Sequence, residues 1–254
     1  MRALGSRGRY ALSVLLLVAL WAAAAHVAAS PTLPGPGAVA AAMAAETASG
    51  QLPHHLGVTL LRVAAAFTLA LSIGTAIGVL MGRSRTVDDL LGPWLLLTLN
   101  VPALVVIVLA YVWMGLTEAA AITAVSINKI PNVVVLVREG ARAADEKLFQ
   151  MARAYRMGRW ETLRHVLFPQ LQPYLLAASR SGLALIWKIV LVVELLGRSD
   201  GVGFQIHLFF QLFDITRLLA YTLAFVAVAQ LIEMAVLTPV ETHVRRWRVA
   251  RSDA

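Results

Sequence analysis

Six runs of about twenty mostly apolar residues divide this chain of 254 residues and limit its fold more than any other feature. A helix needs roughly 20 such residues to cross the hydrocarbon layer of a membrane. Helices suit that layer because they satisfy their backbone polar groups internally. We therefore expect an all-α integral membrane protein with six transmembrane helices, at Tyr10–Ala29, Leu56–Met81, Leu90–Met114, Ala119–Val137, Leu171–Leu196 and Leu218–Val240.

The composition supports several spans, since 59% of the residues are hydrophobic and only 14% are charged. The first run follows three arginines and looks like a secretory signal. It is longer than the roughly 7–15 apolar residues of a signal core, so we expect a retained span, with a cleaved signal as the alternative. The chain has no cysteine, which excludes a disulfide framework and a thiolate nucleophile.

The basic residues gather on one side of the predicted membrane. Connections on the other side carry only Arg198 and Arg217. Because cytoplasmic loops are enriched in lysine and arginine, this asymmetry predicts that both termini are cytoplasmic. The basic residues assigned to the cytoplasm are Arg2, Arg7, Arg9, Arg83, Arg85, Arg138, Arg142, Lys147, Arg153, Arg156, Arg159, Arg164, Arg245, Arg246, Arg248 and Arg251.

The chain is expected to form one core with an N-terminal addition. Residues 1–51 would hold the first helix and a periplasmic linker, whose proline- and glycine-rich start predicts a turn into a short surface helix. Residues 52–240 would form a core of five helices. This core includes a cytoplasmic loop at residues 142–169, here called the basic segment, and residues 241–254 would form a basic tail.

The basic segment carries an apolar stripe among its arginines. At helical spacing it places Trp160, Leu163, Val166 and Leu167 on one face, with Arg159 and Arg164 elsewhere on the turn. Such a stripe must pack against something. One reading is a docking helix for the groove of a partner, and the other is a helix on the membrane surface held by anionic lipid.

Short motifs follow one another in a fixed order along residues 31–248. They are Thr32–Pro36, Arg62-Val63, Gly74–Gly82, Pro102, Ala152-Arg153, Arg159-Trp160, Leu167–Pro169, Pro173, Trp187 and Glu194–Gly197. Their order and spacing resemble the permease subunits of type I ATP-binding-cassette (ABC) importers. Within that family they resemble the branch that imports nitrate, taurine, alkanesulfonates and similar small solutes. The resemblance implies the type I importer permease fold and a multi-pass protein of the bacterial inner membrane.

In this family a cytoplasmic loop of two short helices, joined by a turn near a glycine, docks into a groove of the ATPase. Without gaps, Gln150 stands at the family's glutamate and Arg156 at its glycine. Gly158 lies two residues later, and we expect it to supply the positive backbone angle of the turn. The resemblance assigns ATPase coupling to Gln150, Ala152, Arg153, Arg156, Gly158, Arg159, Trp160, Leu163, Arg164, Phe168 and Pro169.

The resemblance also implies partners. They are ABC ATPase subunits, a second permease copy expected as a homodimer, a periplasmic solute-binding protein and the lipid bilayer, without nucleic acid. The sequence has no glycine-lysine phosphate loop, so ATP and Mg²⁺ are expected in the partner ATPase and no cofactor in this chain. It offers no metal site and no credible catalytic set, so we expect a transport subunit for a small solute such as a nitrate-, sulfonate- or taurine-type anion.

Polar residues within the spans are candidates for a translocation path, because ionisable groups in a membrane are costly. We expect Asn100 and Pro102 in the third span, and Ser126, Asn128 and Lys129 with Pro131 in the fourth, to interrupt helices near mid-depth. They would line a polar passage in which Lys129 offers a fixed cation. The alternative is a proline kink whose freed carbonyls are met by neighbouring amides.

Other polar residues carry competing interpretations. Lys188 and Glu194 in the fifth span could touch solute, or they could form a structural lock or subunit contact. Glu194 is expected near the outer interface, with partners from other spans or the second subunit, and Arg62 is expected to snorkel outward. His54 and His55 are expected as a solvated loop pair. A secondary active transporter that uses Lys129 and Glu194 as a coupled charge pair is the alternative function.

Overall fold

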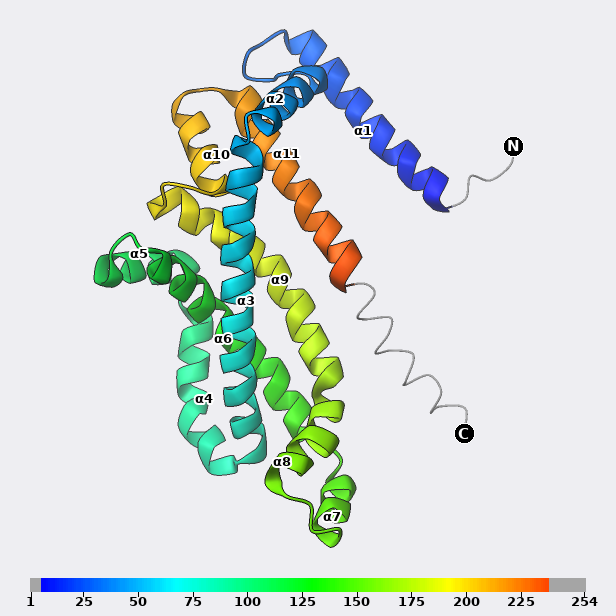
Figure 1. Cartoon of the computed structure of the whole chain (residues 1–254), viewed down its shortest axis with the longest axis vertical. Helices are drawn as coiled ribbons and strands as arrows, with labels where there is room; N and C mark the ends of the chain where they lie inside the picture. Colours follow the sequence, from blue (N-terminus) through cyan, green and yellow to red (C-terminus); the bar gives the residue numbers. More distant parts are fainter. Residues whose placement is uncertain (1–5, 238–254) are drawn as a thin grey trace.

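The computed structural model describes residues 6–237, and helices fill most of that range (Figure 1). Three long helices, α3, α6 and α9, run along the long axis of the molecule, while α7 and α8 form one end. The α-helices are α1 Ser6–Ala28, α2 Pro36–Ala48, α3 Gln51–Arg83, α4 Arg85–Asn100, α5 Ala103–Met114, α6 Glu118–Arg142, α7 Glu146–Ala154, α8 Arg159–Thr162, α9 Phe168–Gly197, α10 Val202–Gln211 and α11 Ile215–Ile232. Two π-helical turns are η1 Leu163–Leu167 and η2 Glu233–Leu237.

Five stretches within the described residues are long and apolar enough to cross a membrane: Gly8–Ala28, Gln51–Arg83, Glu118–Arg142, Arg159–Gly197 and Ile215–Ala235. They confirm five of the six predicted spans, with the part of the last prediction beyond residue 237 outside the described range. The remaining predicted span, Leu90–Met114, is broken into two helices, which give a sixth span if the bent pair is counted as one. It consists of α4 and α5, bent by 98°.

The bend has a local cause. Val101 is extended at φ −73° and ψ 125°, and Pro102 follows it as the N-cap of α5. Proline disfavours the helical conformation in the residue before it and has no N–H to donate. The prediction that Asn100 and Pro102 interrupt the third span is therefore confirmed. Pro131 behaves differently, since α6 runs through it without a break, and the interruption predicted there was wrong.

Glycines bring α3 and α6 into close contact. Gly74, Gly78 and Gly82 recur every four residues on the face of α3 that meets α6. A β-carbon built on Gly78 would lie 2.8 Å from Cβ of Val137 and 3.0 Å from the carbonyl oxygen of Val134. Small residues at this spacing let helix backbones approach in membranes, where packing and not apolar burial drives association.

The remaining elements gather at the end of the core opposite α7 and α8. Helix α2 packs on α11, and α10 packs against α9 and α11. The short surface helix predicted after the first span is α2. Helix α1 extends away from the core (Figure 1). A hydrogen bond of 3.1 Å from Trp21 Nε1 to the carbonyl of Pro34 joins it to the loop that precedes α2.

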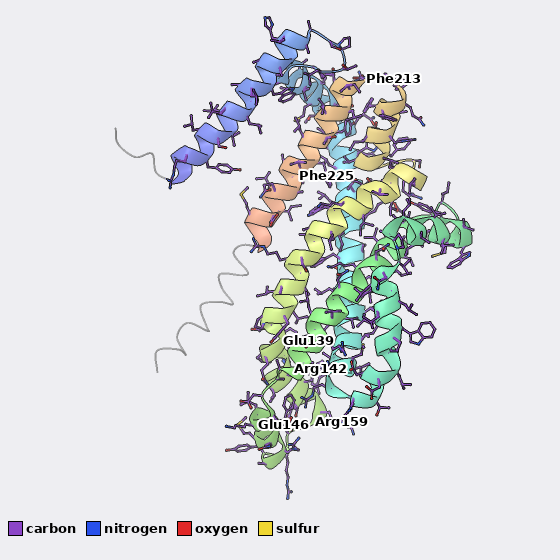
Figure 2. All side chains as sticks on the ribbon, turned by 180° about the vertical axis from the view of Figure 1, so that it is seen from behind. Glu139, Arg142, Glu146, Arg159, Phe213 and Phe225 are labelled. Carbon is purple, nitrogen blue, oxygen red and sulfur yellow. The ribbon has the colours of Figure 1, made fainter. Side chains whose placement is uncertain are left out.

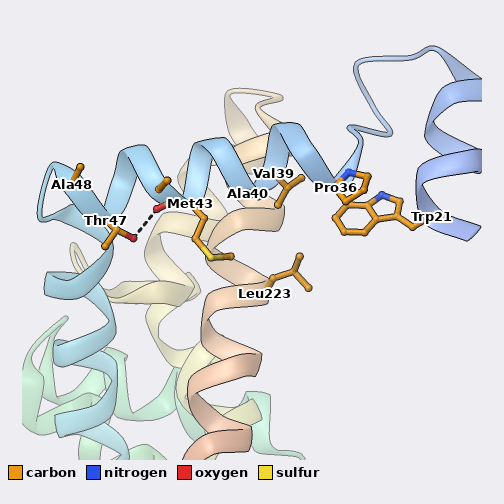
Figure 3. A pocket seen from close by; sticks show the side chains of 9 residues that line it. Trp21, Pro36, Val39, Ala40, Met43, Thr47, Ala48 and Leu223 are labelled. Atoms are coloured by element: carbon orange, nitrogen blue, oxygen red, sulfur yellow. Dashed lines mark hydrogen bonds between the residues drawn. The ribbon is translucent and has the colours of Figure 1, made fainter. Parts of the chain in front are cut away.

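A pocket of about 560 Å³ lies where α1, α2 and α11 come together (Figure 3). Its lining is mostly apolar and includes Trp21, Val39, Met43 and Leu223. Thr47 turns its hydroxyl back to the carbonyl of Met43, at 2.7 Å. The pocket therefore presents little polar surface for specific recognition.

Candidate functional site

The basic segment forms two short helices joined by a tight turn. Helix α7 begins at the N-cap Asp145, whose carboxylate accepts a 2.8 Å hydrogen bond from the N–H of Lys147. At its end, the N–H of Met157 reaches the carbonyl of Ala152 at 2.9 Å, and the N–H of Arg156 reaches that of Arg153 at 3.0 Å. These two bonds define a Schellman motif, which places Arg156 at the position that glycine usually fills.

The backbone of Arg156 is left-handed, with φ 51°, whereas Gly158 has φ −64° and is the N-cap of α8. The expectation that Gly158 supplies the positive angle was wrong. As the N-cap of α8, Gly158 donates its N–H to the carboxylate of Glu161 at 3.0 Å. Arg156, the residue that aligns with the family's glycine without gaps, adopts the glycine-like conformation.

We expect the substitution Arg156→Gly to stabilise the folded protein. A left-handed residue with a β-carbon costs about 1–2 kcal/mol relative to the ordinary conformation, and glycine relieves most of that cost. The free energy of unfolding should rise by up to about 1 kcal/mol. The rise is smaller than the strain relieved, because glycine also increases the conformational entropy of the unfolded chain. Denaturant unfolding in detergent measures it. Gly158→Ala should not show a comparable gain from relieved strain, and equal stabilisation by both changes would contradict this account.

The apolar stripe predicted in the basic segment divides into two parts. Val166 and Leu167 are buried with Phe149, Ala152 and residues of α6 and α9. In contrast, Trp160 is 70% exposed and Phe168 is 50% exposed. The stripe therefore does not present a single face to a partner or to the membrane, since half of it holds the segment to the core. Of the predicted coupling residues, Ala152 is buried, and those on the surface are Gln150, Arg153, Arg156, Gly158, Arg159, Trp160, Leu163, Arg164, Phe168 and Pro169.

Charged contacts also anchor the basic segment to α3. The guanidinium carbon of Arg83, at the end of α3, lies 4.0 Å from the ring centroid of Phe149. The same guanidinium is 3.6 Å from the carboxylate of Glu146, which also pairs with Arg153. Figure 2 places Glu146 and Arg159 together at this end of the molecule. Any rigid displacement of α7 therefore pulls on the end of α3.

A second set of ion pairs joins α4 to α6 next to the basic segment. Asp88 lies near the start of α4, and its carboxylate is 2.5 Å from Nε of Arg138 and also contacts Arg142. Both arginines lie in the last turns of α6. Sequence reasoning counted these arginines for orientation and missed their partner, because the two helices are about fifty residues apart in the chain.

At the opposite end of the core, Arg62 binds three carboxylates, which together we call the Arg62 cluster: Arg62, Glu118, Glu194 and Asp200. Arg62 Nη1 is 2.8 Å from Glu194 Oε1 and 2.9 Å from the carbonyl of Asp200. Its Nε is 2.9 Å from Glu118 Oε2, and its Nη2 contacts the carboxylate of Asp200. Four elements meet here: α3, α6, α9 and the loop before α10.

One sequence expectation for this cluster was wrong, since Arg62 is only 3% exposed and does not snorkel. Glu194 is fully buried within the protein, three residues before the end of α9, and its place near the outer membrane interface stays a prediction. The expectation that Glu194 takes a partner from another span is confirmed. Burial on its own would raise the pKa of the Asp200 carboxyl, but the hydrogen bond and charge of Arg62 lower it below its ordinary value. Asp200 is therefore ionised at neutral pH.

Two further side chains of α3 secure the loop that precedes α10. Thr59 donates to Glu194 at 3.0 Å and accepts from the N–H of Val202 at 2.8 Å. His55 accepts from the N–H of Gly201 through Nδ1 at 3.0 Å. His55 is buried within α3, so the prediction of a solvated loop pair was wrong for it. Position 201 requires glycine for two reasons. Its φ of 101° lies in the left-handed region, and a β-carbon there would meet the carboxylate of Glu194.

The predicted path residues do not form one continuous group. Asn100, Pro102 and Lys188 are exposed, Ser126 is buried, and Asn128 is partly buried. Ser126 and Asn128 turn their side chains back to carbonyls of their own helix, at 2.7 and 2.9 Å. Their role in translocation stays a prediction.

Lys129 and Glu194 do not form the charge pair that a secondary transporter would use. Lys129 lies against Gly182 of α9, where a built β-carbon would be 2.7 Å from its Cε. Glu194 is further along the same helix by about 18 Å, at 1.5 Å of rise per residue. Its partner is Arg62. The part of the chain that the structure describes holds no cluster of three metal-ligating side chains.

The sequence model of the family described as "Binding-protein-dependent transport system inner membrane component" matches residues 74–246 of the chain. The chain belongs to this family. It is the membrane-spanning permease subunit of an ABC transporter, and the resemblance found in the sequence motifs is confirmed.

Named relatives agree with this assignment. A protein from Bacillus subtilis named as an aliphatic sulfonates transport permease is 28% identical over 92% of this chain and 85% of its own. An Escherichia coli protein of the same description is 31% identical over 74% of this chain and 72% of its own length. A nitrate import permease from Synechocystis is 28% identical over 58% of this chain and 54% of its own.

The fold has solved counterparts. An amino acid ABC transporter crystallised with histidines superposes with a TM-score of 0.61 at 20% identity, covering 80% of this chain and 97% of that one. The MetNI methionine ABC transporter, in inward facing conformations, gives a TM-score of 0.59 at 20% identity, covering 74% and 92%. At this identity the match establishes the fold alone. The all-helical permease fold predicted from the sequence is confirmed.

Proposed function

We propose that the chain imports a small organic or inorganic anion of the sulfonate or nitrate type. A periplasmic solute-binding protein would deliver the solute, and separate ATPase subunits would hydrolyse ATP. This chain would supply the passage, paired with a second permease copy as a homodimer. The names of the sulfonate and nitrate relatives support the solute class.

The surface of the basic segment carries the proposal for ATPase docking. Trp160 stands exposed at the start of α8, and Arg159 and Arg164 of the same segment are also exposed. A segment that exposes both an aromatic side chain and arginines suits a groove with an apolar floor and acidic rim, because tryptophan and arginine dominate binding energy at interfaces. A lipid-surface helix is less apt, since the other half of the stripe is buried in the core.

The proposed mechanism is alternating access driven by the ATPase pair. Closure of the ATPases would push the basic segment, which is tied to α3 through Arg83 and lies next to the pairs joining α4 to α6 through Asp88. These ties favour movement of the helices as packed units. Solute and nucleotide would then shift the population between two arrangements of the same helices.

The orientation follows from the basic residues. The end formed by α7 and α8 would face the cytoplasm, and the end with α2 and α10 would face the periplasm. Lysine and arginine are enriched in cytoplasmic connections, and the basic segment carries six of them, whereas the connections at the opposite end carry only Arg198 and Arg217. The chain would thus lie in the bacterial inner membrane with both termini inside.

A pull-down from mild detergent tests the docking surface. The tagged wild type should recover an ATPase with a phosphate loop, identified by mass spectrometry. The variant Trp160→Ala/Phe168→Ala should recover at least tenfold less, since loss of two exposed anchors at about 2 kcal/mol each exceeds one factor of ten.

The matched control is Trp113→Ala, because Trp113 is 76% exposed and belongs to α5, a helix that lies away from α7 and α8 (Figure 1). This variant should recover the ATPase as well as the wild type does. Equal loss in both variants would point to misfolding, and full recovery with Trp160→Ala/Phe168→Ala would exclude this docking surface. If the wild type itself recovers no ATPase, the proposal of an ATPase-driven importer fails.

A further inference from the structure

Lys129 is buried near the middle of α6, and no described residue provides it with a counter-ion. The residue is 2% exposed, and its Nζ has no hydrogen-bond partner among residues 6–237. Glu194, the buried acid of α9, is occupied by Arg62, Thr59 and the N–H of Gly203. The unpartnered ammonium is therefore different in kind from Arg62, which binds three carboxylates.

The absence of a side chain at Gly182 leaves room for the side chain of Lys129 between α6 and α9. Gly182 faces it from α9, with a built β-carbon 2.7 Å from Cε and 3.4 Å from Nζ. Any larger residue at 182 would displace the lysine. The side chain is enclosed by its own chain, so neither a lipid headgroup nor a second permease copy reaches Nζ unless α6 and α9 separate.

An unpaired polar group in this position destabilises the arrangement that buries it. Removing an ammonium from water costs several kcal/mol unless a partner compensates it. A methionine of similar length would fill the same space without that cost. The lysine thus opposes the closed α6–α9 contact, and an anion that bound Nζ would lower the free energy of an arrangement in which the two helices part.

We propose that Lys129 is the specificity-determining contact for the anionic group of the transported solute, exposed when α6 separates from α9 at Gly182. The inference rests on the proposed function and identifies the residue that distinguishes an anion from a neutral molecule of the same shape. The solute class is a small oxyanion that accepts hydrogen bonds from an ammonium, such as a sulfonate.

The test uses thermal unfolding of the purified full chain in nanodiscs, with methanesulfonate as the anionic probe and dimethyl sulfone as its uncharged analogue of similar shape. Methanesulfonate at about ten times its half-saturating concentration should raise the unfolding midpoint of the wild type by about 2–6 °C. Dimethyl sulfone should not raise it. Sodium chloride at the same ionic strength separates general salt effects from binding.

Three variants make the result specific. Lys129→Met should unfold at or above the temperature of the wild type and should not respond to methanesulfonate. Gly182→Ala, which retains the lysine but displaces it, should respond several-fold more weakly than the wild type. Lys147→Met is the matched control, because Lys147 is an exposed lysine of α7 and lies outside the predicted translocation path, and it should respond like the wild type.

The proposal is overturned if Lys129→Met unfolds well below the wild type, which would assign the lysine a structural role. It is also overturned if methanesulfonate stabilises Lys129→Met as much as the wild type, or stabilises neither. These measurements need no ATPase, whereas the proposed importer is tested by ATPase recovery. A chain that recovers the ATPase but shows no response through Lys129 would retain the proposed function and lose this inference.

Discussion

Replacing Arg62 by methionine is expected to lower the free energy of unfolding by about 3–5 kcal/mol, the usual loss when one partner of a buried ion pair is removed. Methionine fills the volume of the arginine stem but leaves the fully buried carboxylate of Glu194 without its cation. It also leaves Glu118 and Asp200 near that carboxylate as like charges. Unfolding by denaturant in detergent measures the loss.

Two further variants decide whether the loss comes from the stranded charge. Arg62→Met/Glu194→Gln removes both members of the buried pair, and glutamine can still accept from the N–H of Gly203 and from Thr59. It should recover a substantial part of the loss, because replacing both partners is often nearly neutral. Arg217→Met is the control, since that arginine pairs with Glu46 while half exposed, and it should cost less than about 1 kcal/mol. A double variant as unstable as Arg62→Met would contradict the argument.

The Arg62 cluster is one of two sets of charge contacts, which lie at opposite ends of the core. The cluster joins α3, α6, α9 and the loop before α10 at the end opposite the basic segment. The ion pairs of Asp88 and the stacking of Arg83 on Phe149 join α3, α4, α6 and α7 at the other end. Charge contacts therefore lie at both ends of the core, while its middle is held by small-residue packing and contains the unpaired Lys129.

The sequence predicted the helices well because each span is specified by its own residues. Five of the six predicted spans coincide with helices of sufficient length, and the family motifs identified the fold. The broken span was partly foreseeable, since Pro102 identified the break. The angle of 98° was not, because a proline in the sequence indicates where a helix breaks but not the backbone angles at the break.

The pairings were not predictable for a different reason. Arg62 meets Glu194 across 132 residues of chain, and nothing local to either residue indicates the other. Arg62 was therefore interpreted singly, as a snorkelling arginine. Glu194 was expected to have a partner in another span, but the sequence did not identify which residue that partner is. Likewise, the turn of the basic segment was assigned to Gly158 by residue type, whereas the hydrogen bonds of α7 place the left-handed position at Arg156.

The α3–α6 interface provides the second large effect, because a methyl group added at Gly78 has nowhere to go. Gly78→Ala would bring a β-carbon to 2.8 Å from Cβ of Val137 and 3.0 Å from the carbonyl of Val134, neither of which can rotate away. The helices must separate or tilt, at a cost of about 1–3 kcal/mol. Unfolding by denaturant in detergent should show this loss.

Gly57→Ala on the same helix is the matched control. A β-carbon there meets nothing within 4 Å, so the change should stabilise the protein by about 0.5–1 kcal/mol through helix propensity alone. Opposite signs at the two positions would establish that the glycine spacing of α3 serves close packing. Equal signs would mean that α3 and α6 have room to adjust. In that case α6, which carries Lys129, would not be held tightly against α3. Helix α6 could then separate from α9 without α3 moving with it.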